Sequence, residues 1–275
     1  MVTVGSRLYS SVNNNRENVS GLFNFIVPLF ASVTWLVLWC LDFSFDVKVL
    51  PYSFLYGIGY SFFTIGMLGA MKTGSTSLTA LIKQVSLVGV TLWGFAFWNT
   101  KFTMISAVGL VLIVISLCLC LLTREKKEDS GNFFKWLIYV LLIAVGNAGC
   151  SIVQRYQQMA FNYQHRYMFM YFGLLFATVT CLFLSVKEKK SNWPAAFRSS
   201  WIFAAMAGCG SAFSNVCILL LIKHDMSPVI IYPGVAVGGL MLTTLISLVG
   251  FREKLRPAQW VGLGVGAVAL VLLNL

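Results

Sequence analysis

Phe30-Ala-Ser-Val-Thr-Trp-Leu-Val-Leu38 and Phe176-Ala-Thr-Val-Thr-Cys-Leu-Phe-Leu184 are two apolar stretches that are identical at six of nine positions. The second stretch begins 146 positions after the first, and Ser32 corresponds to the similar Thr178. Neither stretch carries a charge, and each lies in a longer apolar run. A match of this kind across half the chain indicates an internal duplication, a feature that recurs in membrane proteins.

The runs around these two stretches are long enough to cross a bilayer, which requires about 20 mostly apolar residues. The chain is 58% hydrophobic and 11% charged, whereas soluble domains carry about 25% charged residues. Its mean hydropathy is +0.81. Strands of a membrane barrel are short and alternating, so runs of this length predict helices. We therefore predict an all-α integral membrane protein with about nine transmembrane helices, at Leu22–Leu41, Leu50–Met71, Leu78–Trp98, Phe102–Leu122, Phe133–Val153, Tyr167–Val186, Trp201–Ile222, Pro228–Val249 and Pro257–Leu275.

The duplication continues beyond the opening match. Further residues correspond at offsets of 151 and then 153, namely Gly57 with Gly208, Gly59 with Gly210, Phe62 with Phe213, Lys72 with Lys223, Lys101 with Lys254, Gly109 with Gly262, Leu110 with Leu263 and Leu117 with Leu270. We predict a first repeat at residues 1–128 with four helices and a second at residues 129–275 with five, together forming one transmembrane domain. Because five is odd, the two repeats would be inverted relative to each other.

The stretch at residues 4–9 resembles residues 149–156, at the end of the fifth helical run. We therefore expect the first helix of repeat one to be missing from an ancestral plan of two inverted five-helix repeats. Lys and Arg residues divide 14 to 5 between the two sides, which places the N-terminus in the cytoplasm and the C-terminus outside.

Four motifs carry a resemblance to a known family. They are Gly74-Ser-Thr-Ser-Leu-Thr-Ala-Leu81, Ser227-Pro-Val-Ile-Ile-Tyr-Pro233, Gly250-Phe-Arg-Glu-Lys-Leu-Arg-Pro257 and Gln259-Trp-Val-Gly-Leu-Gly-Val-Gly-Ala-Val-Ala-Leu270. With these motifs the chain resembles the EamA-like drug/metabolite transporter superfamily. The resemblance implies ten helices in two five-helix repeats, a transport function, and both termini in the cytoplasm. The last point disagrees with the charge count. The first copy also departs from the pattern, with Asn99-Thr100-Lys101 where Glu would be expected.

Lys83 is the one ionisable residue predicted to lie well inside a span. A cation in hydrocarbon is costly without a partner, so Lys83 is a candidate substrate-binding residue. The alternative is that its stem reaches the interface from about five residues inside the helix. Gln84, the next residue, would bind substrate if Lys83 does, and would lie near the interface if the Lys83 stem reaches it.

Five further residues are candidates for lining a substrate cavity. Asn147 and Asn215 place amides inside predicted helices, although hydrogen bonds between helices would also explain them. Tyr232 precedes Pro233 at a predicted kink, which a packing role would also explain. Tyr60 and Trp93 complete the set, with packing or an interface position as the alternative.

Several classes of function are excluded or disfavoured. The nine acidic residues all lie in predicted loops or at helix ends, which disfavours coupling through a buried carboxylate. The seven cysteines form no metal-binding spacing, and no intramembrane protease motif occurs, so we predict no metal, no cofactor and no enzyme. The net charge is +11, but the cationic residues lie in predicted loops and at helix ends, as is typical of a membrane protein. We therefore predict no nucleic-acid partner.

We therefore predict a secondary-type permease or exporter in the plasma membrane, for a small metabolite or amphipathic compound. Its substrate site would lie near the midplane between the repeats. The alternative is a non-transporting scaffold or a transporter remnant. Pairing of two chains into a homodimer would cover apolar surface left by the missing helix.

Overall fold

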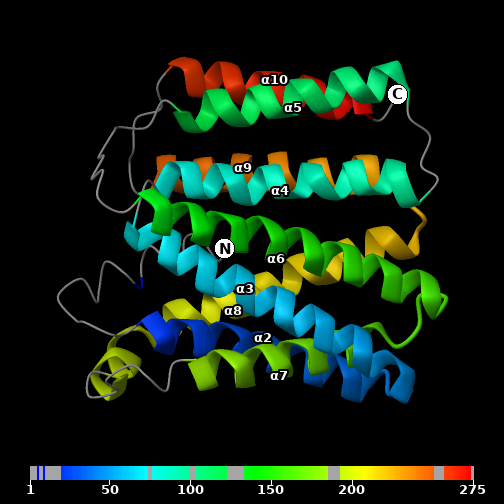
Figure 1. Ribbon diagram of the computed structural model, residues 1–275, viewed down its shortest axis with the longest axis vertical. Coiled ribbons are helices and arrows are strands. Elements are labelled where there is room, and N and C mark those ends of the chain that lie inside the picture. Colours follow the sequence, from blue (N-terminus) through cyan, green and yellow to red (C-terminus); the bar gives the residue numbers. More distant parts are fainter. Residues whose placement is uncertain are drawn as a thin grey trace. The chain divides into compact units, whose positions relative to one another are not determined.

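The computed structural model describes residues 5, 9, 20–73, 76–98, 103–122, 133–184, 193–250 and 257–273. These residues are all-helical apart from short connections, and they form nine α-helices and the three-residue 3-10 helix η1 (Val47–Val49) (Figure 1). The α-helices are α2 (Ser20–Leu41), α3 (Leu50–Thr73), α4 (Thr76–Phe97), α5 (Met104–Leu122), α6 (Phe133–Ala160), α7 (Arg166–Leu184), α8 (Trp193–Lys223), α9 (Pro228–Gly250) and α10 (Pro257–Leu273).

The helix bounds agree with the predicted ranges to within two residues at all but two ends. The first exception is α6, which was predicted to end at Val153 and continues to Ala160. The second is α8, which begins at Trp193. Arg155, which the sequence placed in a connection, therefore lies within α6, five residues before its end. The depth of Lys83 inside a span stays a prediction. The apolar pattern fades after Val153, but the glutamines that follow are buried and hydrogen-bonded, so the helix continues.

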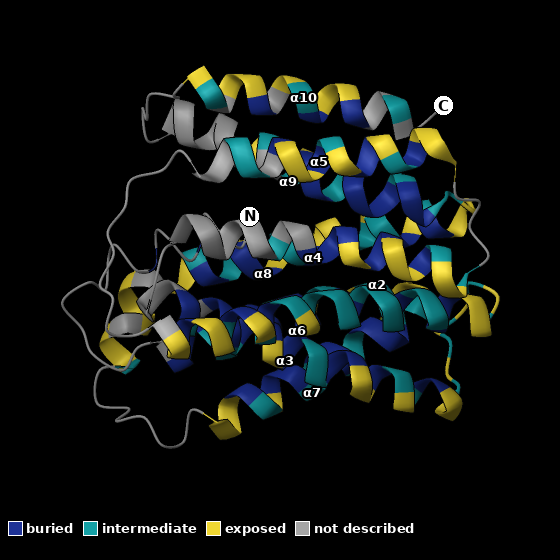
Figure 2. Ribbon diagram, turned by 45° about the horizontal axis from the view of Figure 1, so that its top comes forward, coloured by how far each residue is buried: buried dark blue, intermediate teal, exposed yellow. Residues whose placement is uncertain are grey.

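Four helical segments are long and apolar enough to cross a membrane within the part of the chain described. They are Gly21–Leu41, Phe134–Ala160, Arg166–Leu184 and Trp201–Lys223. Large apolar side chains are exposed on these helices, for example Phe134 at 74% and Val145 at 64% in α6. Figure 2 shows such exposed residues along faces opposite to buried ones. Soluble proteins rarely expose apolar surface on this scale, and a lipid environment explains it.

The chain divides into two compact units. Unit 1 comprises residues 1–65 and 152–223, and unit 2 comprises residues 66–151 and 224–275. In unit 1, α2 packs against α7 and α8. In unit 2, α4 packs against α9 and α5 packs against α10, as Figure 1 also shows. Each of these units takes helices from both predicted repeats, and the division at residue 128 remains a prediction.

A close helix crossing in unit 1 joins α3 to α7 at Gly57. A Cβ atom at Gly57 would lie 2.7 Å from the carbonyl oxygen of Gly173 and 2.8 Å from Cβ of Phe176. It would lie 3.2 Å from the backbone nitrogen of Ala177. The first two distances are shorter than real Cβ atoms show, so glycine permits the two helices to approach this closely.

A second crossing in the same unit joins α8 to α2 at Gly208. A Cβ atom there would lie 2.5 Å from the carbonyl oxygen of Val27, 3.1 Å from Cβ of Phe30 and 3.2 Å from the nitrogen of Ala31. The same three atom types surround both glycines. Gly208 lies 151 positions after Gly57, and the residues around Gly57 lie 146 positions after those around Gly208. Each crossing thus pairs a glycine with a stretch that corresponds to the stretch at the other crossing, as a duplication would produce. The inverted arrangement of the repeats stays a prediction.

The segment predicted to resemble the end of α6 lies mostly outside the described residues. Of it, Gly5 and Tyr9 are described, and both are helical. The Tyr9 ring centroid lies 4.9 Å from that of Phe23 on α2.

Candidate functional site

Asn147 joins helices α6 and α4 in unit 2 through both hydrogens of its side-chain amide. Its Nδ2 donates to the carbonyl oxygen of Lys83 over 3.0 Å and to the Oγ of Ser86 over 2.7 Å. Because a backbone carbonyl can only accept, Nδ2 and not Oδ1 must face Lys83. The orientation of the amide is thereby fixed, with Nδ2 rather than Oδ1 bound to α4.

The acceptors on α4 are themselves tied together. The Oγ of Ser86 donates to the carbonyl oxygen of Lys83 over 2.7 Å, so that carbonyl accepts two hydrogen bonds. Ser86 is buried, whereas Lys83 and Asn147 are each half-buried. The three groups form a small closed polar arrangement inside two otherwise apolar helices.

Tyr232 adds helix α9 to this arrangement. Its phenolic hydroxyl donates to the carbonyl oxygen of Ser151 over 3.2 Å, and the Oγ of Ser151 donates to the carbonyl oxygen of Asn147 over 3.2 Å. The Tyr232 side chain is buried, and its ring centroid lies 6.5 Å from that of Trp98. Pro233 follows it inside α9 and has no N–H to donate to the preceding turn. The kink at this position stays a prediction.

We call these five residues, which are Lys83, Ser86, Asn147, Ser151 and Tyr232, the α4–α6–α9 polar cluster. It brings together three of the seven residues predicted from the sequence. Sequence reasoning missed Ser86 and Ser151. Serine is common in apolar helices, and the sequence alone does not show which residue its side chain contacts. The signal that could have found them is their spacing: Ser86 lies three residues after Lys83, and Ser151 lies four after Asn147.

Of the other four predicted residues, Trp93, Tyr60 and Asn215 lie outside the polar cluster. Trp93 on α4 stacks on Phe97, with ring centroids 4.2 Å apart, and is 37% exposed. Gln84 lies on α4, but its side chain is outside the described part of the structure.

In unit 1, Tyr60 is buried and its ring lies 6.2 Å from each of Tyr56 and Phe63. Asn215 is half-buried on α8, and its Nδ2 donates to the carbonyl of Ser211 in the same helix over 2.9 Å. The amides of Asn147 and Asn215 thus differ, since the first bridges two helices and the second bonds within its own helix.

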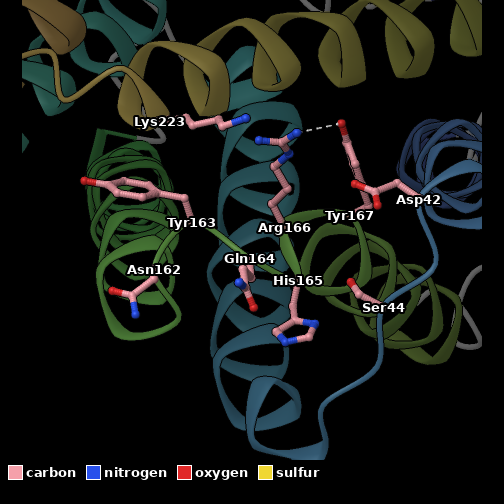
Figure 3. Close-up of a pocket in the computed structure, with 9 residues that line it drawn as sticks. All are labelled: Asp42, Ser44, Asn162, Tyr163, Gln164, His165, Arg166, Tyr167 and Lys223. Carbon is pink, nitrogen blue, oxygen red and sulfur yellow. Dashed lines mark hydrogen bonds between the residues drawn. The ribbon is translucent and has the colours of Figure 1, made fainter.

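Unit 1 contains a polar pocket of about 460 Å³ at one set of helix ends (Figure 3). It is lined by the segment after α2, the α6–α7 connection, the start of α7 and the end of α8, with Asp42, Ser44, Asn162, Tyr163, Gln164, His165, Arg166, Tyr167 and Lys223 as lining residues.

Buried glutamines at the end of α6 support the α6–α7 connection. Nε2 of Gln157 donates to the carbonyl of Gln164 over 3.1 Å, and Nε2 of Gln158 donates to Oε1 of Gln157. Both side chains are fully buried. Sequence reasoning missed them because it ended the helix at Val153 and assigned the following polar residues to a loop.

No described helix carries an aspartate or glutamate, and the described residues contain no group of three or more His, Cys, Asp or Glu placed to hold a metal ion. The polar groups at hand are therefore amides, hydroxyls, backbone carbonyls and a few cations. Such groups suit a ligand that donates and accepts hydrogen bonds.

The comparison with protein families matches residues 22–274 to the family described as "Sugar transport protein". The chain belongs to this family. The family is a member of the drug/metabolite transporter superfamily, so the superfamily inferred from the motifs is confirmed. Family membership makes the chain a multi-pass membrane protein, with a transport role rather than a catalytic one.

A solved structure titled "Crystal structure of protein" resembles this chain with a TM-score of 0.62. The match covers 100% of this chain and 96% of that one at 12% identity. At this identity the likeness concerns the fold alone. A search of the curated proteins finds no match.

Proposed function

We propose that this family member is a secondary-type permease that carries a neutral sugar across the plasma membrane. Family membership over residues 22–274 supports a sugar as the class of substrate. The absence of acidic residues from the described helices fits a solute without charge, or one moved down its own gradient. The EamA-like relation, the nine spans and a site near the midplane between two repeats belong to the same proposal. The homodimer also remains a proposal.

The fixed amide of Asn147 is the observation that carries the proposal. Both of its N–H groups are already used, and its Oδ1 accepts no hydrogen bond from the described residues. An oriented acceptor of this kind suits a sugar hydroxyl, because the orienting cost is met before the ligand binds. We infer that Oδ1 of Asn147 accepts a hydroxyl of the substrate.

The neighbouring residues have supporting roles in this proposal. Ser86 and the Lys83 carbonyl hold the amide of Asn147, and Tyr232 holds α9 against the same stretch of α6. The Lys83 ammonium would donate to a second hydroxyl. Tyr60, Trp93, Gln84 and Asn215 stay predicted substrate contacts. Single substitutions at these four positions test that role in the uptake assay described next.

Uptake into proteoliposomes tests the proposal with a panel of radiolabelled hexoses and pentoses. The wild type is expected to take up at least one of them faster than protein-free liposomes. Asn147→Leu should lower that rate by roughly tenfold or more, since a hydrogen-bonded group lost from a polar site typically costs about 1–3 kcal/mol. Uptake no faster than in empty liposomes for every sugar would favour the scaffold or remnant reading.

A matched pair of serines separates a role at the site from a general effect on helices. Ser86 and Ser214 each donate to a carbonyl of their own helix, but Ser86 alone of the two also accepts from Asn147. Ser86→Ala should reduce uptake several-fold, and Ser214→Ala should leave it unchanged. Equal uptake by the two variants would contradict the assignment of the site to the polar cluster.

A further inference from the structure

The pocket of unit 1 contains two cations directed at the same space. Figure 3 shows Lys223 and Arg166 pointing toward one another from the end of α8 and the start of α7. A guanidinium N–H of Arg166 donates to the Tyr167 hydroxyl over 3.0 Å, and the guanidinium lies 4.8 Å from the centroid of that ring. Among the described residues, no ion pair neutralises Arg166 or Lys223. Arg166 is half-buried and Lys223 is exposed. Two cations that face one space attract an anion placed between them.

We propose that this pocket binds a phosphate-type oxyanion between Arg166 and Lys223. Arginine presents a planar fork that fits two oxygens of a phosphate, and lysine adds a point charge. The pocket also lies at the N-terminal end of the 19-residue α7, where unpaired backbone N–H groups carry partial positive charge. The phosphate can belong to a soluble solute or to a lipid headgroup.

The backbone that forms the pocket is built at an energetic cost. Asn162, Tyr163 and His165 have φ of 47°, 64° and 55°, in the left-handed region that disfavours residues other than glycine. The backbone N–H of Tyr163 donates to the Gln158 carbonyl over 2.8 Å, and the buried glutamines hold the rest of the connection. Local strain that the surroundings maintain is concentrated at ligand sites.

Asp42 gives the pocket a second chemical character. Figure 3 places its carboxylate beside Tyr167, across the pocket from Lys223. A carboxylate there repels a bare anion but accepts hydrogen bonds from hydroxyl groups. The lining therefore fits a ligand in which a phosphate is linked to hydroxyl-bearing carbon atoms, as in a sugar phosphate or a phosphoglycerol headgroup. This site is distinct from the α4–α6–α9 polar cluster, and its existence does not depend on the proposed sugar transport.

Calorimetric titration of the whole protein with inorganic phosphate tests the proposal. The protein is placed in nanodiscs of zwitterionic phosphatidylcholine and chloride buffer. Saturable binding is expected, and Arg166→Gln and Lys223→Gln should each weaken it by at least about tenfold, the usual loss for a hydrogen bond to a charged group. Asp42→Asn should tighten it, because a repelling charge is removed.

Lys48→Gln is the matched control, since Lys48 is an exposed cation on the α2–α3 connection that does not line the pocket. It should change phosphate affinity by less than twofold. Lys223→Gln guards against a folding defect in Arg166→Gln, because Arg166 also contacts Tyr167. No saturable binding, or equal binding by Lys223→Gln and the wild type, would overturn the proposal.

Nanodiscs with part of the lipid replaced by phosphatidylglycerol distinguish the two sources of phosphate. Loss of phosphate binding there supports a lipid headgroup as the occupant, because the lipid competes for the site. Undiminished binding supports a soluble phosphorylated solute. A protein that fails to take up sugars and still binds phosphate through Arg166 and Lys223 would refute the proposed function alone.

Discussion

Gly208→Ala adds one methyl group at the crossing of α8 and α2. The new Cβ would lie 2.5 Å from the Val27 carbonyl oxygen and 3.2 Å from the Ala31 nitrogen, both backbone atoms that cannot rotate away. Ordinary contact begins at 3.4 Å. The two helices would have to separate by roughly 0.9 Å, the difference from the shortest of these distances, which loosens their contacts along the crossing.

Such overpacking costs about 1–3 kcal/mol, and the better helix propensity of alanine recovers up to about 1 kcal/mol. We therefore expect a net loss of about 1–2 kcal/mol in the free energy of unfolding. At roughly 2–4 °C per kcal/mol for a chain of this size, the melting temperature should fall by about 2–8 °C. Gly57→Ala should behave alike, because its surroundings match those of Gly208.

Thermal unfolding of the purified protein in one detergent measures the three variants side by side. Gly264→Ala is the control, because a Cβ at this exposed position of α10 would meet no atom within 4 Å. It should melt at or slightly above the wild-type temperature. If Gly208→Ala and Gly57→Ala have the same melting temperature as Gly264→Ala, the close approach of these helices is refuted. If the melting temperature of only one of these two crossing variants is lowered, the two crossings are not equivalent.

Three further outcomes follow from other contacts. Tyr232→Phe removes the hydrogen bond to the Ser151 carbonyl and should slow sugar uptake several-fold. The control Tyr171→Phe on α7 should leave uptake unchanged. Equal uptake rates for the two variants would show that the Tyr232 hydroxyl has no role in transport. Lys83→Met should reduce uptake if its ammonium contacts the sugar, with Lys48→Met as the exposed control, and unchanged uptake would support snorkelling. Asn162→Ala should lower the free energy of unfolding by about 1 kcal/mol while Asn162→Gly should not, because φ of 47° suits glycine; chemical denaturation distinguishes them.

Helix positions could be predicted from this sequence because the membrane requires long apolar runs. Eight of the nine predicted ends and most starts lie within two residues of the observed ones, as at Leu50 in α3 and Pro228 in α9. The two failures occur where apolar character fades before the helix does. Gln157 and Gln158 lie buried after Val153, where the Gln158 amide donates to Oε1 of Gln157 and the Gln157 amide donates to the Gln164 carbonyl.

The correspondence between Gly57 and Gly208 was also visible in the sequence, for a different physical reason. A helix crossing that needs glycine leaves a residue type that few substitutions can replace, as at Gly57 and Gly208. The two related stretches open with Phe30 and Phe176, whose Cβ atoms face Gly208 and Gly57. Pattern comparison therefore detects crossings that depend on small residues better than those that depend on hydrogen bonds.

Asn147 and Asn215 show why the site itself could not be predicted to the same depth. Both are single amides in apolar helices, and the sequence offers the same two readings for each. The structure separates them through a neighbour: Asn147 meets Ser86 and the Lys83 carbonyl on another helix, whereas Asn215 reaches the Ser211 carbonyl of its own. An amide whose donors are satisfied within its own helix can turn away without loss to the fold. An amide held from a second helix keeps its oxygen fixed in space, and a transporter needs that property to recognise one hydroxyl among many.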